Sequence, residues 1–419
     1  MAITFRHTSI RHLQGTISKF IKIAALEKPK FSIHSGGEAR QLAFLLGILA
    51  TAKVTTFLPL YLFSDIPRAG FMLELGTKWD SGFYVKIAQL GYFAASNPGG
   101  DNAFAFSPVL PSMIAAVKLL TGSYWMAGLL VVNIFDFLFP IIVCKLSDFK
   151  TALITAMFPV YLVFSTITYS DDITLFFLAL SLILLLNRKS YFFAGLSLAF
   201  AVLTSYAVIL TVPIFVAKIL ITDEDRRSIF DRRSMVSKLK DLTRFLSPVV
   251  AGALLIAAFF LFETGSLWTF FNIQKNAGWD VGLVTPVAQD RFLLVGWFTG
   301  FHWTVMGIRL PQIYWLLRNL AFESFYVAGV VLLFLSMRKN SISNGLFLAG
   351  IALSIMVPLF FLGGVAAASV PRLFLPAFPI FVGYSHGLIK SKNSIILYCA
   401  LCLAIAPFIA LVQLDALFA

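Results

Sequence analysis

Long apolar stretches separated by short polar segments recur along the chain between Gln41 and Phe418. They are about 17 to 25 residues long, enough for a helix to cross a hydrocarbon layer of roughly 30 Å. Inside lipid only helices or closed barrels satisfy the backbone polar groups, and these stretches lack the alternation of barrel strands. The pattern therefore predicts an all-α polytopic membrane protein with about eleven spanning helices.

The predicted spans alternate in direction. The apolar segment 108–120 is too short to span the membrane, so we expect it to lie as a helix at the outer interface. The segment 191–221 must start and end on the same side of the membrane, so we expect two short helices that turn near Thr204 and Ser205. The predicted spans are 41–63, 125–146, 152–169, 173–186, two within 191–221, 247–262, 312–337, 342–362, 373–389 and 395–412.

Charged residues set the orientation of these spans. Hydrophobic residues make up 59% of the chain and charged residues 13%, where a soluble domain has roughly half and a quarter. The net charge of +13 comes largely from Lys and Arg in short segments between spans, which is typical of cytoplasmic loops rather than of nucleic-acid binding. The N-terminus is therefore predicted to be cytoplasmic.

This orientation divides the chain into a basic cytoplasmic segment, 1–40, and a transmembrane domain, 41–419. The basic segment is interpreted either as an amphipathic helix on an anionic membrane surface or as a disordered tail. Two long loops, about 64–124 and about 263–311, are predicted to lie outside. Loops beyond about 15 residues usually carry function, so the first of them is the expected catalytic loop.

Asp80 is the main candidate in the first external loop. It should lie at the N-terminus of a short helix that stops at Gly91 in the αL conformation. There it could be a simple helix cap. Its neighbours Trp79 and Tyr84, in a loop between two membrane helices, favour a carboxylate that meets an amphiphilic substrate.

Several motifs follow one another in an order that is found in a known family. They are Trp79-Asp80-Ser81, Tyr84, Ile87-Ala88, Gly91-Tyr92 and Asn102-Ala103-Phe104-Ala105-Phe106-Ser107-Pro108, then Phe158-Pro159, Phe164-Ser165, Tyr169-Ser170-Asp171-Asp172, Leu203-Thr204 and Arg372-Leu373-Phe374-Leu375-Pro376-Ala377-Phe378-Pro379. In these motifs the chain resembles the PIG-V mannosyltransferases, which add the second mannose to glycosylphosphatidylinositol and have prokaryotic relatives. The chain departs from the family pattern at Ser107 and at Thr204-Ser205, so its substrate preference could differ.

The resemblance implies a GT-C glycosyltransferase fold, polyprenyl (dolichyl) phosphate mannose as donor, and an essential acidic residue at the position of Asp80. The chemistry of such relatives is an inverting single displacement, in which Asp80 would take the proton of the acceptor hydroxyl. The less favoured role for Asp80 is that of a metal ligand. No organic cofactor is expected, and a divalent cation is left open.

The remaining candidates each have a structural alternative. Asp171 and Asp172 match an acidic position of the family, often Glu, and would position the acceptor or contact a metal, unless they only cap the helix that follows. Arg372 would bind the donor phosphate, unless it is a snorkelling anchor at the bilayer surface. Trp79 and Tyr84 are expected to contact substrate. His302, Lys86 and Arg291 are weaker candidates, since each could be an ordinary interfacial residue.

Two other functions compete with mannosyl transfer to a lipid-linked or glycan acceptor on the non-cytoplasmic face. A transporter or flippase of lipid-linked glycans should show charged residues inside several spans and discontinuous helices. Asp136 and Glu323 are the few acids predicted inside spans. A non-catalytic subunit of a glycosyltransferase complex is the other alternative. The expected partners are the lipid-phosphate sugar, the acceptor and membrane lipids, without nucleic acid, and a prokaryotic cell membrane is favoured over the endoplasmic reticulum.

Overall fold

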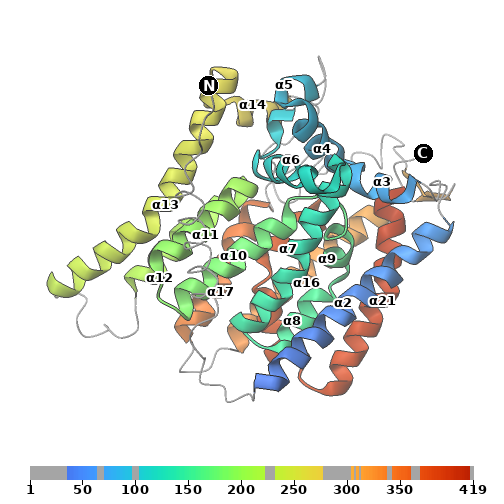
Figure 1. The fold of residues 1–419 in the computed structure, drawn as a ribbon. Coiled ribbons are helices and arrows are strands. Elements are labelled where there is room, and N and C mark those ends of the chain that lie inside the picture. Colours follow the sequence, from blue (N-terminus) through green and yellow to red (C-terminus); the bar gives the residue numbers. More distant parts are fainter. Residues whose placement is uncertain are drawn as a thin grey trace. The chain divides into compact units, whose positions relative to one another are not determined.

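The computed structural model divides the chain into two compact units, Met1–Leu42 and Ala43–Ala419. Only the first two turns of helix α2 are described for the first unit, so the fold is that of the second unit (Figure 1). The predictions for 1–40 fall almost entirely outside the described residues. The described residues are 35–63, 70–96, 103–221, 232–276, 303–305, 308–310, 313–336, 342–359 and 369–415.

The described part of the chain is almost entirely helical, and five of its helices are long and apolar enough to cross a membrane. Their length and composition fit an integral membrane protein, as the sequence predicts. The count of eleven spans stays a prediction. The five helices are α2 (Ser35–Phe63), α7 (Tyr124–Leu146), α13 (Arg232–Thr264), α16 (Ile313–Leu335) and α21 (Lys392–Asp415).

Shorter helices lie between these five. The first external loop contains α3 (Phe71–Thr77), α4 (Asp80–Leu90), α5 (Tyr92–Ala95), the 3₁₀ turn η2 (Ala103–Ala105) and α6 (Val109–Thr121). The others are α8 (Phe149–Ala156), α9 (Pro159–Phe164), α10 (Asp171–Leu186), α11 (Tyr191–Thr204), η3 (Tyr206–Thr211), α12 (Val212–Leu220), α14 (Thr269–Asn276), α17 (Ile342–Leu359), α19 (Val370–Leu373), η6 (Leu375–Ala377) and α20 (Ile380–Gly387). Strands β1 (Trp303–Val305) and β2 (Ile308–Leu310) pair antiparallel, with Thr304 opposite Arg309.

Two predicted spans are wrong as continuous helices. The segment 152–169 is divided into α8 and α9, because Pro159 cannot donate a backbone hydrogen bond and holds Phe158 in an extended conformation. The segment 373–389 is divided into α19, η6 and α20 by Pro376 and Pro379 in the same way. Short-range bonds bridge both breaks, such as Phe158 N–H to the Thr155 carbonyl at 3.2 Å and Phe378 N–H to the Leu375 carbonyl at 2.9 Å.

Other boundaries agree more closely with the sequence. Helix α6 fills the predicted interfacial segment and ends at Gly122, whose φ of 73° is left-handed. Helix α11 ends at Thr204, and η3 and α12 follow, so the predicted interruption near Thr204 and Ser205 is confirmed, while the reversal of the chain there stays a prediction. Helix α13 begins at Arg232, well before the predicted 247, because the basic sequence ahead of its apolar part is helical too.

The packing of the helices brings three helix segments together at the candidate site. Helices α7, α10, α11 and α13 contact one another in that order (Figure 1). The α11–α13 contact is close because Gly195 has no Cβ, which would overlap the carbonyl of Phe245. Helix α4 packs on α6 and α7, and α19 packs on α9 and α16. This packing brings together the starts of α4 and α10 and the short helix α19.

Candidate active site

The backbone around Asp80 has an unusual conformation. Trp79, directly before α4, has φ 56° and ψ −133°, a combination that costs energy for any residue with a Cβ. Gly82 lies so close to the carbonyl oxygen of Thr77 that a Cβ would be 2.8 Å from it. The tight turn before α4 therefore depends on this glycine and on strain stored at Trp79.

Asp80 does not cap its helix. It is the first residue of α4, the cap position is Trp79, and the side chain of the cap residue makes no hydrogen bond. Gly91 ends the helix as predicted and has a positive φ of 80°, but its ψ of 175° is not that of an αL residue. The Asp80 carboxylate instead accepts a hydrogen bond from Arg372.

Arg372 links the two acidic positions that the sequence singles out. Its Nη1 donates to Oδ2 of Asp80 at 2.9 Å, and its Nε lies 3.9 Å from Oδ2 of Asp171. The second distance is too long for a hydrogen bond. Nε of Arg372 has no hydrogen-bond partner among the described residues. These three residues, 80, 171 and 372, are referred to as the arginine cluster.

The arginine cluster is partly open. The side chains of Asp80, Asp171 and Arg372 keep 19%, 17% and 15% of their exposure. The guanidinium lies over the Tyr169 ring, 4.5 Å from its centroid, and 5.8 Å from that of Phe164. An arginine stacked on an aromatic face is held in place while its edge stays free to donate hydrogen bonds.

Burial and charge act against each other in this cluster. Burial raises the pKa of Asp171, Arg372 lowers it in part, and Asp80 raises it again. Burial would lower the pKa of Arg372, but the two carboxylates outweigh it and keep that pKa above its ordinary value. The arginine is therefore charged at any physiological pH.

Tyr84 connects the first external loop to the start of α10. Its hydroxyl shares a hydrogen bond of 3.0 Å with the Ser170 hydroxyl, and both side chains are buried. Burial raises the pKa of Tyr84, so the phenol stays neutral. Its predicted contact with substrate stays a prediction, because the structure shows it in contact with Ser170.

Asp171 and Asp172 begin α10, but the cap position is Ser170 and no side chain caps this helix. Asp171 belongs to the arginine cluster. Asp172 points elsewhere: it is 1% exposed, and its Oδ2 has no hydrogen-bond partner among the described residues. The charges that act on it most are those of Asp136 and Lys53.

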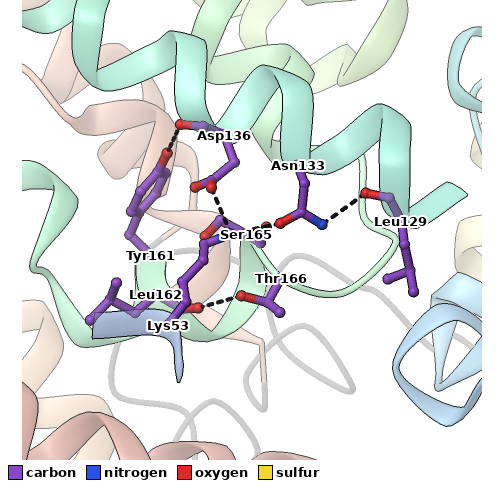
Figure 2. Close-up of polar contacts among 8 residues, drawn as sticks. All are labelled: Lys53, Leu129, Asn133, Asp136, Tyr161, Leu162, Ser165 and Thr166. Carbon is purple, nitrogen blue, oxygen red and sulfur yellow. Dashed lines mark hydrogen bonds and ion pairs between the residues drawn. The ribbon is translucent and has the colours of Figure 1, made fainter. Parts of the chain in front are cut away.

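Lys53 and Asp136 form a second charged cluster, inside the spans α2 and α7 (Figure 2). Nζ of Lys53 lies 2.6 Å from Oδ2 of Asp136 and donates to Oδ1 of Asn133 at 3.1 Å and to the Ser165 carbonyl at 2.8 Å. Asp136 is fully buried. Sequence reasoning noted Asp136 but missed Lys53, although a lysine within an apolar run is itself a signal.

Ser107 contacts the residue directly before Thr204. The Ser107 hydroxyl donates to the carbonyl of Leu203. Ser107 lies two residues before α6, and Leu203 lies in the last turn of α11. The segment before α6 is therefore tied to the end of α11.

The other predicted residues are not part of the arginine cluster as described. Trp79 is 38% exposed and precedes Asp80, so its ring is open to contact. Lys86 is exposed on α4. His302 and Arg291, and most of the second external loop, lie outside the described residues. Among the described residues no group of three or more His, Cys, Asp or Glu side chains could hold a metal ion.

Comparison with protein-family models, curated proteins and solved structures finds no match to this chain. The PIG-V resemblance therefore stays an expectation from the motifs.

Proposed function

We propose that this protein is a GT-C mannosyltransferase with about eleven membrane segments, of the kind seen in the PIG-V family. It would transfer mannose from a polyprenyl phosphate to a lipid-linked or glycan acceptor on the non-cytoplasmic face. The observation that supports this best is Arg372, a half-buried guanidinium held between two carboxylates, with Nε lacking a hydrogen-bond partner among the described residues. Such a group suits a phosphate oxygen.

The donor phosphate would accept hydrogen bonds from Arg372. A phosphate that binds Nε and Nη1 competes with Asp80, which accepts a hydrogen bond from Nη1. Its arrival would release the Asp80 carboxylate toward the acceptor. Asp171, next to the same guanidinium, would stay in place to orient Arg372 or the acceptor hydroxyl.

The proposed step is a single displacement. The acceptor oxygen forms a bond to C1 of mannose while the bond from C1 to the phosphate oxygen breaks. The phosphate keeps that electron pair, and Arg372 stabilises its charge. The acceptor proton passes to Asp80 as general base, and the products are an inverted mannoside and the polyprenyl phosphate.

Transport of a lipid-linked glycan is a second candidate function. The described chain contains charged residues buried inside predicted spans, Lys53, Asp136, Arg318 and Glu323. It also contains the broken helices α8–α9 and α19–α20, a feature expected of transporters. The partly open arginine cluster and the closed Lys53 cluster make transfer the better-supported function.

One experiment separates the candidates. Purified protein in lipid nanodiscs or sealed vesicles is incubated with mannose-labelled polyprenyl phosphate and a lipid extract that supplies acceptors. A transferase moves the label to a new lipid or glycan in both preparations. A transporter leaves the label on the polyprenyl phosphate but moves the labelled lipid across the membrane of sealed vesicles. A non-catalytic subunit neither transfers the label nor moves it.

A further inference from the structure

We infer that Lys53, together with Asp136, is a buried clamp that positions the segment 165–172 of the candidate active site. This inference concerns how the arginine cluster is held in place, so its biological meaning rests on the proposed function. Its physical content, that Lys53 fixes this segment, does not.

The segment 165–172 needs something to hold it. It links α9 to α10 and is not helical between Ser165 and Ser170. Its backbone has one internal hydrogen bond, from Tyr169 N–H to the Ile167 carbonyl at 2.7 Å, while Ser165 and Thr166 donate back to the carbonyls of Tyr161 and Val163 in α9 at 2.9 and 3.3 Å. A buried segment with so few internal bonds must be fixed by contacts from outside it.

The same segment carries much of the candidate site. The ring of Tyr169 lies under the Arg372 guanidinium, and Asp171 lies beside it. Ser170 shares a hydrogen bond with the hydroxyl of Tyr84. A shift of this backbone would therefore move two contacts of the arginine cluster and the Tyr84–Ser170 hydrogen bond together.

Lys53 holds the first residue of the segment. The Lys53 ammonium group donates hydrogen bonds to Asn133 and to the carbonyl of Ser165, and it forms an ion pair with Asp136 (Figure 2). The Ser165 carbonyl lies at the end of α9, where no further helix residue can donate to it. The lysine thus supplies a bond that the broken helix lacks.

The partners of Lys53 are themselves fixed to α7 and α9. Asn133 donates to the carbonyl of Leu129 at 2.8 Å, and the backbone carbonyl of Asp136 accepts from the Tyr161 hydroxyl at 2.9 Å (Figure 2). A charged pair that only neutralised itself would not need a bond to the neighbouring backbone. The geometry instead joins α2, α7 and the end of α9 at one point.

The pair also acts on Asp172, the last residue of the segment. Asp172 is almost fully buried; burial raises its pKa, Asp136 raises it further, and Lys53 lowers it in part. Lys53 therefore holds the segment by its hydrogen bond at Ser165, and its charge offsets part of the repulsion between Asp136 and Asp172.

The test compares a single and a double substitution in lipid nanodiscs. Lys53→Met leaves Asp136 without its cation and should destabilise the whole protein. The double variant Lys53→Met, Asp136→Leu removes both charges and should recover the melting temperature. In that double variant we expect amide hydrogen exchange to become about tenfold faster, or more, in peptides that cover 165–172. Peptides from α11 should keep the wild-type rate.

The matched control removes the exposed pair of Asp241 and Arg244, 3.6 Å apart on α13, by Asp241→Asn with Arg244→Gln. It should leave exchange in 165–172 unchanged. If the double variant recovers stability and its 165–172 peptides still exchange like wild type, Lys53 is a self-contained ion pair and the inference is wrong. Hydrogen exchange needs no substrate, so this outcome is independent of whether the protein transfers mannose.

Discussion

The charged residues of the arginine cluster and of the Lys53 cluster belong to neighbouring regions, yet they differ in exposure. Asp80, Asp171 and Arg372 keep 15% to 19% of their exposure, and Nε of Arg372 lacks a hydrogen-bond partner in the described residues. Lys53 is 8% exposed and Asp136 is fully buried, and Lys53 is held by an ion pair with Asp136 and by two hydrogen bonds. A partly exposed cluster with a donor to spare can receive a ligand, whereas a closed one stabilises the elements around it.

The comparison predicts that the closed cluster matters most for stability. Lys53→Met should lower the free energy of unfolding by about 3–5 kcal/mol, because it leaves the Asp136 carboxylate buried without its cation. The double variant with Asp136→Leu should be within about 1–2 kcal/mol of wild type, since a buried pair can often be replaced by apolar residues. Denaturant unfolding in detergent measures both. Equal losses in the single and the double variant would show that the pair is not coupled.

Substitutions in the arginine cluster should change the affinity for the donor more than they change the stability of the protein. Arg372→Gln should weaken the apparent affinity for polyprenyl phosphate mannose by about tenfold to a hundredfold, the effect of a charge-assisted hydrogen bond of about 1.5–3 kcal/mol. Arg372→Lys should fall between, because an ammonium keeps the charge without the planar fork. Donor titration of the purified variants measures this. Arg244→Gln, which removes an exposed arginine, is the control and should bind like wild type.

The turn before α4 is expected to tolerate no side chain at Gly82. A Cβ there would lie 2.8 Å from the Thr77 carbonyl, so Gly82→Ala should cost about 1–3 kcal/mol. Gly47→Ala on α2 is the matched control, because nothing lies within 4 Å of its Cβ position and alanine favours a helix by up to about 1 kcal/mol. Thermal unfolding of both variants tests the difference. A Gly82→Ala protein as stable as Gly47→Ala would mean that the turn adjusts freely.

The smallest expected effect is a pH dependence from Asp171. Its folded-state pKa is raised above the ordinary 3.8, chiefly by burial, so the folded protein binds this proton more tightly than the unfolded chain. The resulting stabilisation is complete below pH 3.8 and is lost as the pH rises through the folded-state pKa. Melting temperatures of wild type and Asp171→Asn, measured from about pH 3 to 8, should show the wild-type advantage falling as pH rises. A constant difference would contradict the assignment.

Composition and the length of the apolar runs were enough to predict a helical membrane protein and the short helix at α6, and charge-based orientation predicted the interruption after α11. They did not predict that 152–169 is broken, because its apolar residues match a span and only Pro159 signals the break. No proline marks the end of α9 at Phe164, so the sequence did not predict the non-helical residues 165–170 beside the arginine cluster either.

The candidate site was predictable residue by residue but not as an arrangement. Asp80, Asp171 and Arg372 were each singled out by their motifs, with capping or snorkelling as the alternative. That Arg372 joins the two carboxylates is a contact across 292 positions of the chain, which periodicity cannot show. Lys53 was missed because one polar residue hardly changes the apolar character of a span.

We propose that the Asp80 carboxylate takes the proton of the acceptor hydroxyl in a transfer from polyprenyl phosphate mannose. The turnover of Asp80→Asn tests this, because the variant keeps an oxygen to accept from Arg372 and should have a melting temperature near that of wild type. We predict that wild-type protein forms a mannosylated product and that the variant forms it about 10²–10⁴-fold more slowly. A folded Asp80→Asn protein with full turnover, or a wild type with none, would contradict the account.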